Sequence, residues 1–127
     1  MSKRITLVED DVDAAMMLTK LLSNAGYSVT SLHEGTSLVA RDFSLPDLFI
    51  LDNFMPTIHG VALCKYFKLR ANTKRIPVII ISANRQLKNR AQDAGATSFL
   101  GKPFHAKELL ALVESIFANR LQITGRE

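Results

Sequence analysis

Residues 76–82 read Ile76-Pro77-Val78-Ile79-Ile80-Ile81-Ser82, an almost wholly apolar run that closes on a hydroxyl group. A strand with apolar side chains on both of its faces is typical of the centre of a parallel sheet, because helices cover such a sheet on either side. The stretch therefore predicts a central strand of an α/β domain.

Strand and helix patterns alternate on both sides of this stretch. Strands are expected at residues 4–8, 27–32, 47–51 and 97–100, and helices at 12–24, 35–43, 58–70, 85–94 and 104–120. Five β–α units joined by right-handed crossovers place helices on both faces of a parallel sheet. We expect one domain over residues 1–121 and a short tail at 122–127.

For two of the expected helices, the sequence predicts a boundary or a buried side. The first helix should stop at Ala25-Gly26, a common C-terminal signal. The third should begin at Ile58 or Gly60 and bury one side, comprising Val61, Leu63 or Cys64, Phe67 and Leu69. The single cysteine, Cys64, is then a core or boundary residue and has no internal disulfide partner.

Composition and charge argue against nucleic-acid-binding, membrane-spanning and secreted proteins. The net charge is +4, but the basic residues are scattered without interleaved aromatic rings, so we interpret them as solvated helix faces and expect no direct nucleic-acid binding. No apolar stretch approaches the length of a membrane span, and Met1-Ser2-Lys3-Arg4 has no signal-peptide pattern. A cytoplasmic location is expected.

Four of the expected strands end at polar residues. Glu9-Asp10-Asp11 follow the first strand, Asp52 ends the third, Ser82 ends the fourth and Gly101-Lys102-Pro103 follow the last. Ligands of open α/β sheets bind outside the carboxyl ends of the strands. If the strands are parallel neighbours, these side chains converge on one pocket.

The chemistry of that pocket follows from its charges. Glu9, Asp10 and Asp52 would repel one another unless a cation neutralised them, and Mg²⁺ is held by such carboxylates while it accepts phosphate oxygens. Aspartate can accept a phosphoryl group, and Lys102 and Ser82 could stabilise the charge in transfer. The alternative is that acidic residues at strand ends only cap helices, as Asp11 or Asp13 could do.

These residues match a known family. The chain resembles the response-regulator receiver domain of two-component signalling, including the chemotaxis regulators, over nearly its whole length. The matching segments are Leu7-Val8-Glu9-Asp10-Asp11, Leu51-Asp52-Asn53-Phe54-Met55-Pro56, Ile80-Ile81-Ser82-Ala83 and Gly95-Ala96 through Leu100-Gly101-Lys102-Pro103-Phe104. The resemblance implies a flavodoxin-like (βα)5 fold, doubly wound, with a parallel five-stranded sheet in the order 2-1-3-4-5.

The resemblance also implies roles for single residues. Asp52 would be the phospho-acceptor, and Mg²⁺, or Mn²⁺ in its place, would be held by Glu9, Asp10, Asp52 and the backbone carbonyl of Phe54. Lys102 would contact the phosphoryl group. Ser82 and the aromatic Phe99 would form the switch that repacks the surface of the fourth helix, fifth strand and fifth helix. The Lys102-Pro103 bond is commonly cis in this family.

The family further implies partners. The phosphoryl donor would be a sensor histidine kinase or a histidine phosphotransfer protein, and the output would be an unidentified partner or output domain, with phosphorylation-dependent homodimerisation as one form of response. The protein would be a signalling switch that assists only its own phosphorylation and dephosphorylation, rather than an enzyme acting on other substrates.

Three positions depart from the family or vary within it. His59 stands where the family usually has aspartate, and we interpret it as a surface loop residue rather than a metal ligand. Phe54 and Asn84 lie two residues beyond Asp52 and Ser82, at positions that influence the lifetime of the phosphoryl group in this family. Phe54 has no polar group to orient water, so slow self-dephosphorylation is expected.

Other readings of the sequence remain open. One is a receiver-like scaffold that binds partners without being phosphorylated. Another is a phosphatase of the haloacid dehalogenase type, which would need a second aspartate where this chain has Phe54. A third is a receiver cut from a longer regulator with its own output domain.

Overall fold

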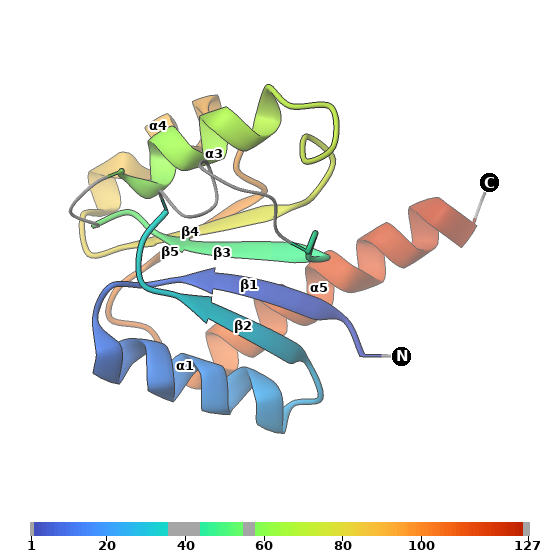
Figure 1. Ribbon diagram of the computed structural model, residues 1–127, viewed down its shortest axis with the longest axis horizontal. Coiled ribbons are helices and arrows are strands. Elements are labelled where there is room, and N and C mark those ends of the chain that lie inside the picture. Colours follow the sequence, from blue (N-terminus) through green and yellow to red (C-terminus); the bar gives the residue numbers. More distant parts are fainter. Residues whose placement is uncertain (1, 36–43, 55–57, 126–127) are drawn as a thin grey trace.

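In the computed structural model, which describes residues 2–35, 44–54 and 58–125, five parallel strands form one sheet (Figure 1). They are β1 (Arg4–Val8), β2 (Ser28–Leu32), β3 (Leu48–Asp52), β4 (Val78–Ser82) and β5 (Ser98–Gly101). Every neighbouring pair is parallel and the order is β2-β1-β3-β4-β5. The predicted fold class and strand order are confirmed.

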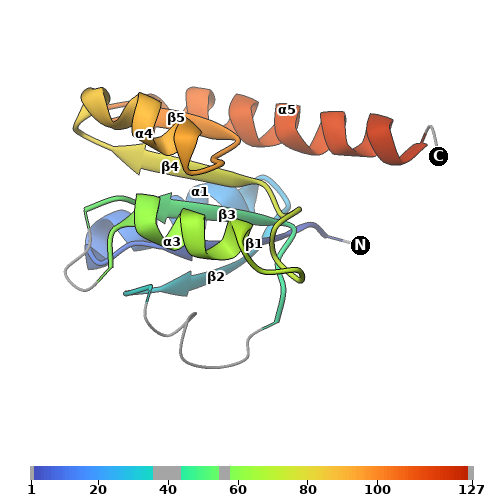
Figure 2. The ribbon, with the colours of Figure 1, turned by 90° about the horizontal axis from the view of Figure 1, so that it is seen from above.

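Helices cover both faces of this sheet. They are α1 (Val12–Asn24), α3 (Gly60–Lys68), α4 (Lys88–Asp93), which follows a 3₁₀ turn at Arg85–Leu87, and α5 (Ala106–Gly125). Helices α3 and α4 pack on one face, and α1 and α5 on the other (Figures 1 and 2). The helix expected at 35–43 falls almost entirely on residues 36–43, which lie outside the described residues.

The central strands explain why their sequence is apolar throughout. In β3, Phe49 and Leu51 point into the core under α3 and α4, while Leu48 and Ile50 point into the core above α1 and α5. Successive side chains of a strand face opposite sides. Since both sides are covered, all five residues of β3 and all five of β4 are buried.

The boundaries of α1 follow local chemistry. At its start, Asp11 Oδ1 accepts hydrogen bonds from the backbone N–H groups of Asp13 at 3.0 Å and Ala14 at 3.4 Å. This confirms the capping role expected of Asp11 or Asp13. At its end, Gly26 has a φ of 101°, in the left-handed region that glycine adopts without a steric penalty. The predicted stop at Ala25-Gly26 is confirmed.

Helix α3 corrects one part of the sequence prediction. Leu63, Cys64 and Phe67 are buried as expected, and the Phe67 ring stacks on Phe49 with 4.1 Å between centroids. Leu69 was expected in the core, but it is 87% exposed. The prediction was wrong because α3 ends at Lys68, and the chain turns before Leu69 can continue the buried stripe.

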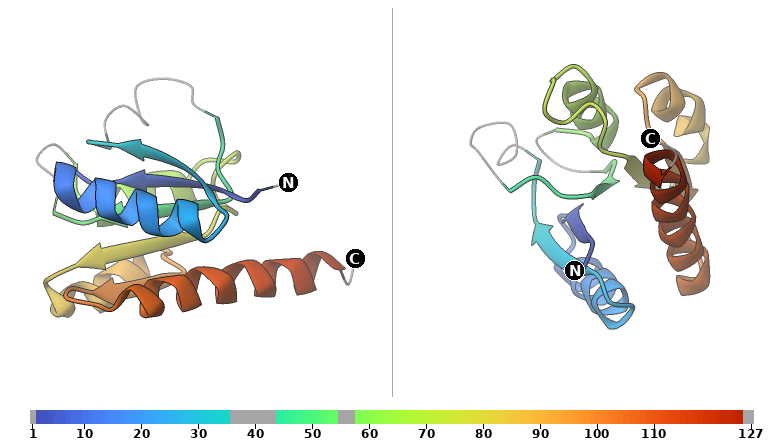
Figure 3. Two further views of the ribbon diagram at one scale, coloured as in Figure 1. Left: turned by 90° about the horizontal axis from the view of Figure 1, so that it is seen from below. Right: turned by 90° about the vertical axis from the view of Figure 1, so that its right-hand side faces the viewer.

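The last helix is longer than the sequence pattern indicated. It was expected to end near Arg120, but α5 continues to Gly125, and its C-terminal part runs out beyond the sheet (Figures 1 and 3). Among the described residues, no helix combines the length and apolar character that a membrane crossing requires.

Candidate functional site

The carboxyl ends of four strands bring the predicted side chains to one edge of the sheet. Glu9 follows β1, Asp52 ends β3, Ser82 ends β4 and Lys102 follows β5. Because all strands are parallel, these ends share one side of the domain. The structure therefore gathers at one edge residues that lie far apart in sequence.

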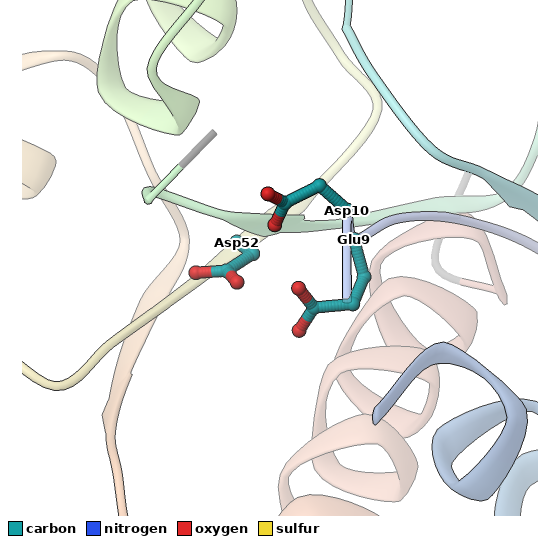
Figure 4. A group of neighbouring side chains, drawn as sticks. All are labelled: Glu9, Asp10 and Asp52. Carbon is teal, nitrogen blue, oxygen red and sulfur yellow. The ribbon is translucent and has the colours of Figure 1, made fainter. Parts of the chain in front are cut away.

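Three carboxylates form the centre of this site. Glu9, Asp10 and Asp52 each place an oxygen within 4.8 Å of the others (Figure 4). Glu9 is 2% exposed and Asp52 is 5% exposed, whereas Asp10 is exposed to solvent. Two buried carboxyl groups and a third at the surface lie close together, an arrangement that favours a bound cation.

Lys102, which follows the carboxyl end of β5, supplies a positive charge at the same edge of the sheet. Its Nζ lies 3.3 Å from Glu9 Oε1 and 3.3 Å from Asp52 Oδ2. Burial on its own would lower the pKa of Lys102, but the charges of Asp52 and Glu9 outweigh it and raise the pKa above its ordinary value. The ammonium group therefore stays charged and bridges the two buried carboxylates.

The ammonium group does not neutralise the whole cluster. Burial raises the pKa of Glu9 to about 7, and the neighbouring Asp52 carboxylate raises it further, against the opposing effects of the Asp11 N–H group and Lys102. Three carboxylates and one ammonium leave a net negative site made of hard oxygen ligands. Mg²⁺ prefers oxygen donors of this kind, so the residues present fit a divalent cation.

Each buried polar side chain is fixed by the loop that follows it. Asp52 Oδ1 accepts from the backbone N–H of Phe54 at 3.1 Å, and Ser82 Oγ accepts from the N–H of Asn84 at 3.0 Å. Glu9 Oε2 accepts from the N–H of Asp11 at 3.2 Å. These bonds orient the side chains before any ligand binds.

A cleft of about 720 Å³ gives access to this site. Asp52, Ser82 and Lys102 line it together, with Phe54 and Asn84 beside them. The structure thus brings the predicted acceptor, hydroxyl and ammonium residues into one open cleft. The Phe54 side chain is 81% exposed.

The aromatic residue of the expected switch lies away from this cleft lining. Phe99, on β5, is partly buried and packs against the core under α3 and α4. The bond between Lys102 and Pro103 is cis, in agreement with the family pattern.

The sequence reasoning missed Asn53, which the structure places at the junction of β3 and α3. Asn53 is 9% exposed, and its Oδ1 accepts from the backbone N–H of Val61 at 3.0 Å. Its carbonyl oxygen lies 3.1 Å from His59 Nδ1. The only signal in the sequence was its place directly after Asp52.

His59 and Gly60 complete this junction. His59 is exposed, as expected for a surface residue, and it directly precedes α3. A Cβ atom on Gly60 would lie 3.0 Å from both the Asp52 carbonyl oxygen and Asn53 Cα. Glycine therefore lets the start of α3 approach the strand end that carries Asp52.

A doubly wound α/β domain with an acidic cluster, a lysine and a hydroxyl at the carboxyl edge of its sheet has the arrangement expected of a two-component signalling domain. The chain belongs to the response regulator receiver domain family, whose model matches residues 5–114. It is therefore a receiver domain of a response regulator in two-component signalling. This class is a signalling domain rather than a conventional enzyme.

Curated relatives agree with this assignment. The chain is 36% identical over 121 residues to the response regulator MprA of Mycobacterium bovis, covering 91% of this chain and 51% of that protein. It is 32% identical over 119 residues to the phosphate regulon transcriptional regulatory protein PhoB of Rhizobium meliloti, covering 91% of this chain and 52% of that protein. The chain thus spans about half the length of these relatives.

Solved structures have the same fold. A protein assigned as a response regulator from Chloroflexus aurantiacus superposes with a TM-score of 0.87 and 32% identity, covering 93% of this chain and 99% of that one. The signal receiver domain of a histidine kinase from Syntrophus aciditrophicus gives a TM-score of 0.85 and 28% identity, covering 93% of this chain and 92% of that one.

Proposed function

We propose that this receiver domain accepts a phosphoryl group on Asp52 and uses it to change its surface. The observation that carries the proposal is the position of Asp52: a nearly buried carboxylate, within 4.8 Å of two others, held by Lys102 at 3.3 Å and open to a cleft. The proposal takes residues 1–121 as the functional unit, with 122–127 as its tail.

The reaction needs one nucleophilic oxygen on Asp52. That oxygen attacks the phosphorus of a phosphohistidine or an acyl phosphate, the bond from phosphorus to the donor breaks, and the donor leaves with the electron pair. The Asp52 Oδ1 atom is held by the Phe54 N–H, which orients the carboxylate for attack. Lys102 contacts the transferred group and stabilises its charge.

A divalent cation completes the charge balance. We assign Mg²⁺, or Mn²⁺ in its place, to Glu9, Asp10, Asp52 and the carbonyl of Phe54; when bound, it neutralises negative charge on the phosphoryl oxygens. The geometry supports the assignment, because Glu9, Asp10 and Asp52 place carboxylate oxygens within 4.8 Å of one another and only one ammonium group, that of Lys102, forms ion pairs with them among the described residues.

Ser82 and Phe99 are proposed to transmit the change. The phosphoryl group draws the Ser82 hydroxyl toward Asp52, which breaks its present contact with the Asn84 N–H. The β4–α4 segment moves with it, and the Phe99 ring turns inward from its place beside α4. A local charge thereby biases two packing arrangements of the α4–β5–α5 surface.

The partners follow from the family and its relatives. We propose a sensor histidine kinase or a histidine phosphotransfer protein as donor, in the cytoplasm. MprA and PhoB are named as a response regulator and a transcriptional regulator, and both are about twice as long as this chain. An output domain or a separate partner would read the α4–β5–α5 surface, with homodimerisation on phosphorylation as one response.

The test is intact mass after incubation with acetyl phosphate and Mg²⁺, beside Asp52→Asn. A gain of one phosphoryl group in the wild type alone is the expected result. If both proteins are folded by circular dichroism and neither gains mass, Asp52 is not an acceptor. A scaffold that binds partners without phosphorylation would then be the better function. Turnover of phosphate esters without a stable adduct would favour the phosphatase instead.

A further inference from the structure

The cleft that exposes Asp52 extends outward between α3 and α4, beyond the residues that the proposed mechanism uses. The two helices lie side by side on the same face of the sheet (Figures 2 and 3). Lys65, from α3, and Arg90, from α4, both line this outer part, and both are exposed. The wall of the cleft therefore carries a cation on each side.

These two cations are not neutralised within the part of the chain that the structure describes. Among the described residues, no carboxylate oxygen lies within 4.0 Å of the charged group of Lys65 or Arg90. Asp52 is the one carboxylate among the described residues that line the cleft. The outer cleft thus has an unbalanced positive charge.

The positive charge of the outer cleft can offset the repulsion between an anionic phosphoryl donor and the acidic cluster. A phosphoryl donor is an anion, and the site that it must reach contains Glu9, Asp10 and Asp52 within 4.8 Å of one another. A bound cation and Lys102 compensate at the reacting centre itself. Along the approach, cations on the cleft wall attract an anion and raise its local concentration.

We propose that Lys65 and Arg90 form an anion-attracting wall that draws small acyl phosphates into the cleft toward Asp52. The inference rests on the proposed function and assigns it two specificity-determining residues that take no part in the transfer. In the reaction, an Asp52 oxygen bonds to phosphorus, the bond between phosphorus and the acyl oxygen breaks, and the acid leaves as its carboxylate. No oxidant, reductant or proton is required.

The test measures the initial rate of phosphoryl gain against acetyl phosphate concentration, with Mg²⁺ present, at low and high ionic strength. The variants are Lys65→Gln, Arg90→Gln and the double variant. Lys88→Gln is the matched control, since Lys88 is an exposed cation on α4 that does not line the cleft. At low salt, we expect the double variant to lose about 10-fold in apparent second-order rate, the low end for electrostatic steering.

Two further features distinguish steering from a general defect. The rate at saturating donor should be unchanged, and the deficit should shrink at high salt because screening weakens interactions between exposed charges. Phosphoramidate carries less net negative charge than acetyl phosphate and should show a smaller deficit. If the double variant matches Lys88→Gln under all conditions, the wall has no role and the inference is wrong.

A binding measurement separates this inference from the proposed function. Acetonylphosphonate has a phosphorus–carbon bond in place of the labile bond, so it can bind without transferring its phosphonate. Its titration into Asp52→Asn protein, followed by amide shifts at Asn53 and Ala83, should show weaker binding when Lys65 and Arg90 are replaced. If the phosphonate binds Asp52→Asn protein through these residues but the wild type gains no phosphoryl group, the proposed function alone is refuted. Binding that does not depend on them refutes the wall.

Discussion

The ammonium nitrogen of Lys102 lies 3.3 Å from a carboxylate oxygen of Asp52, although 50 positions separate the two residues in the sequence. The contact joins the ends of β3 and β5, which are not neighbours in the sheet. It places a positive charge directly beside the carboxylate that we propose as the phospho-acceptor.

Replacement of Lys102 by methionine should therefore slow phosphorylation. With acetyl phosphate and Mg²⁺, we expect the rate to fall about 10²-fold, as for the loss of one group that stabilises transition-state charge. Intact mass against time measures it, with Lys107→Met, an exposed residue of α5, as the control. A fall of less than threefold would show that Lys102 does not contact the group in transfer.

Mg²⁺ should stabilise the fold through the acidic cluster. A ligand at 100 times its dissociation constant stabilises by about 2.7 kcal/mol, so the melting temperature should rise with Mg²⁺ and fall again with EDTA. Asp10→Asn should reduce the rise. Asp13→Asn, which changes an acid outside the cluster, should not. Equal rises in both variants would place the ion elsewhere.

Asn53 should contribute to stability through the start of α3. Its Oδ1 accepts from the Val61 N–H at 3.0 Å, and loss of one such hydrogen bond costs about 1 kcal/mol. Urea unfolding of Asn53→Ala should show this loss. Asn89→Ala, at an exposed position of α4, should stay close to the wild type. No difference between the two variants would mean that water replaces the bond without cost.

Phe54 should make the phosphorylated state long-lived. Its exposed ring lines the cleft beside Asp52 and offers no group to orient a water molecule. We expect Phe54→Gln to speed the loss of the phosphoryl group by about 10-fold, less than the 10²–10⁴ of a full general base. Phe54→Leu should leave the rate unchanged. Rapid loss from the wild type would contradict the expectation.

Cys64 should be unreactive in the folded protein and should affect stability only at high pH. Burial raises the pKa of its thiol from the ordinary 9.0 to about 11, although Lys68 opposes the shift. The folded state therefore keeps a proton that the unfolded state loses above pH 9. The free energy of unfolding should therefore fall as the pH rises from 9 to 11. Below pH 9 the thiol is protonated in both states and should have no effect on it.

Two measurements check this expectation. Iodoacetamide should label Cys64 slowly at pH 8 without denaturant and fully in urea. The free energy of unfolding, measured in urea between pH 8 and 11, should fall more steeply for the wild type than for Cys64→Ala, which has no thiol to titrate. Parallel pH profiles would show that the thiol has the same pKa in both states.

Much of the fold was readable from the sequence because its signals are local. The apolar run of β4, the helical period of α1 and its stop at Gly26 each depend on neighbouring residues alone. Polar residues at the strand ends, such as Asp52 and Ser82, then had to share an edge, because parallel strands end on the same side. The residue types at that edge pointed to phosphoryl chemistry before any distance was known.

Other features depend on how distant segments pack. The sequence placed Leu69 in the core, but the chain leaves α3 at Lys68 and exposes that side chain. The sequence also gave no reason to expect that Asn53 would accept the Val61 N–H, or that Lys65 and Arg90 would face one cleft. These relationships arise only when α3 and α4 pack on the sheet. Hydrogen bonds and interactions between charges act over a few ångströms, and only tertiary packing brings these distant residues that close.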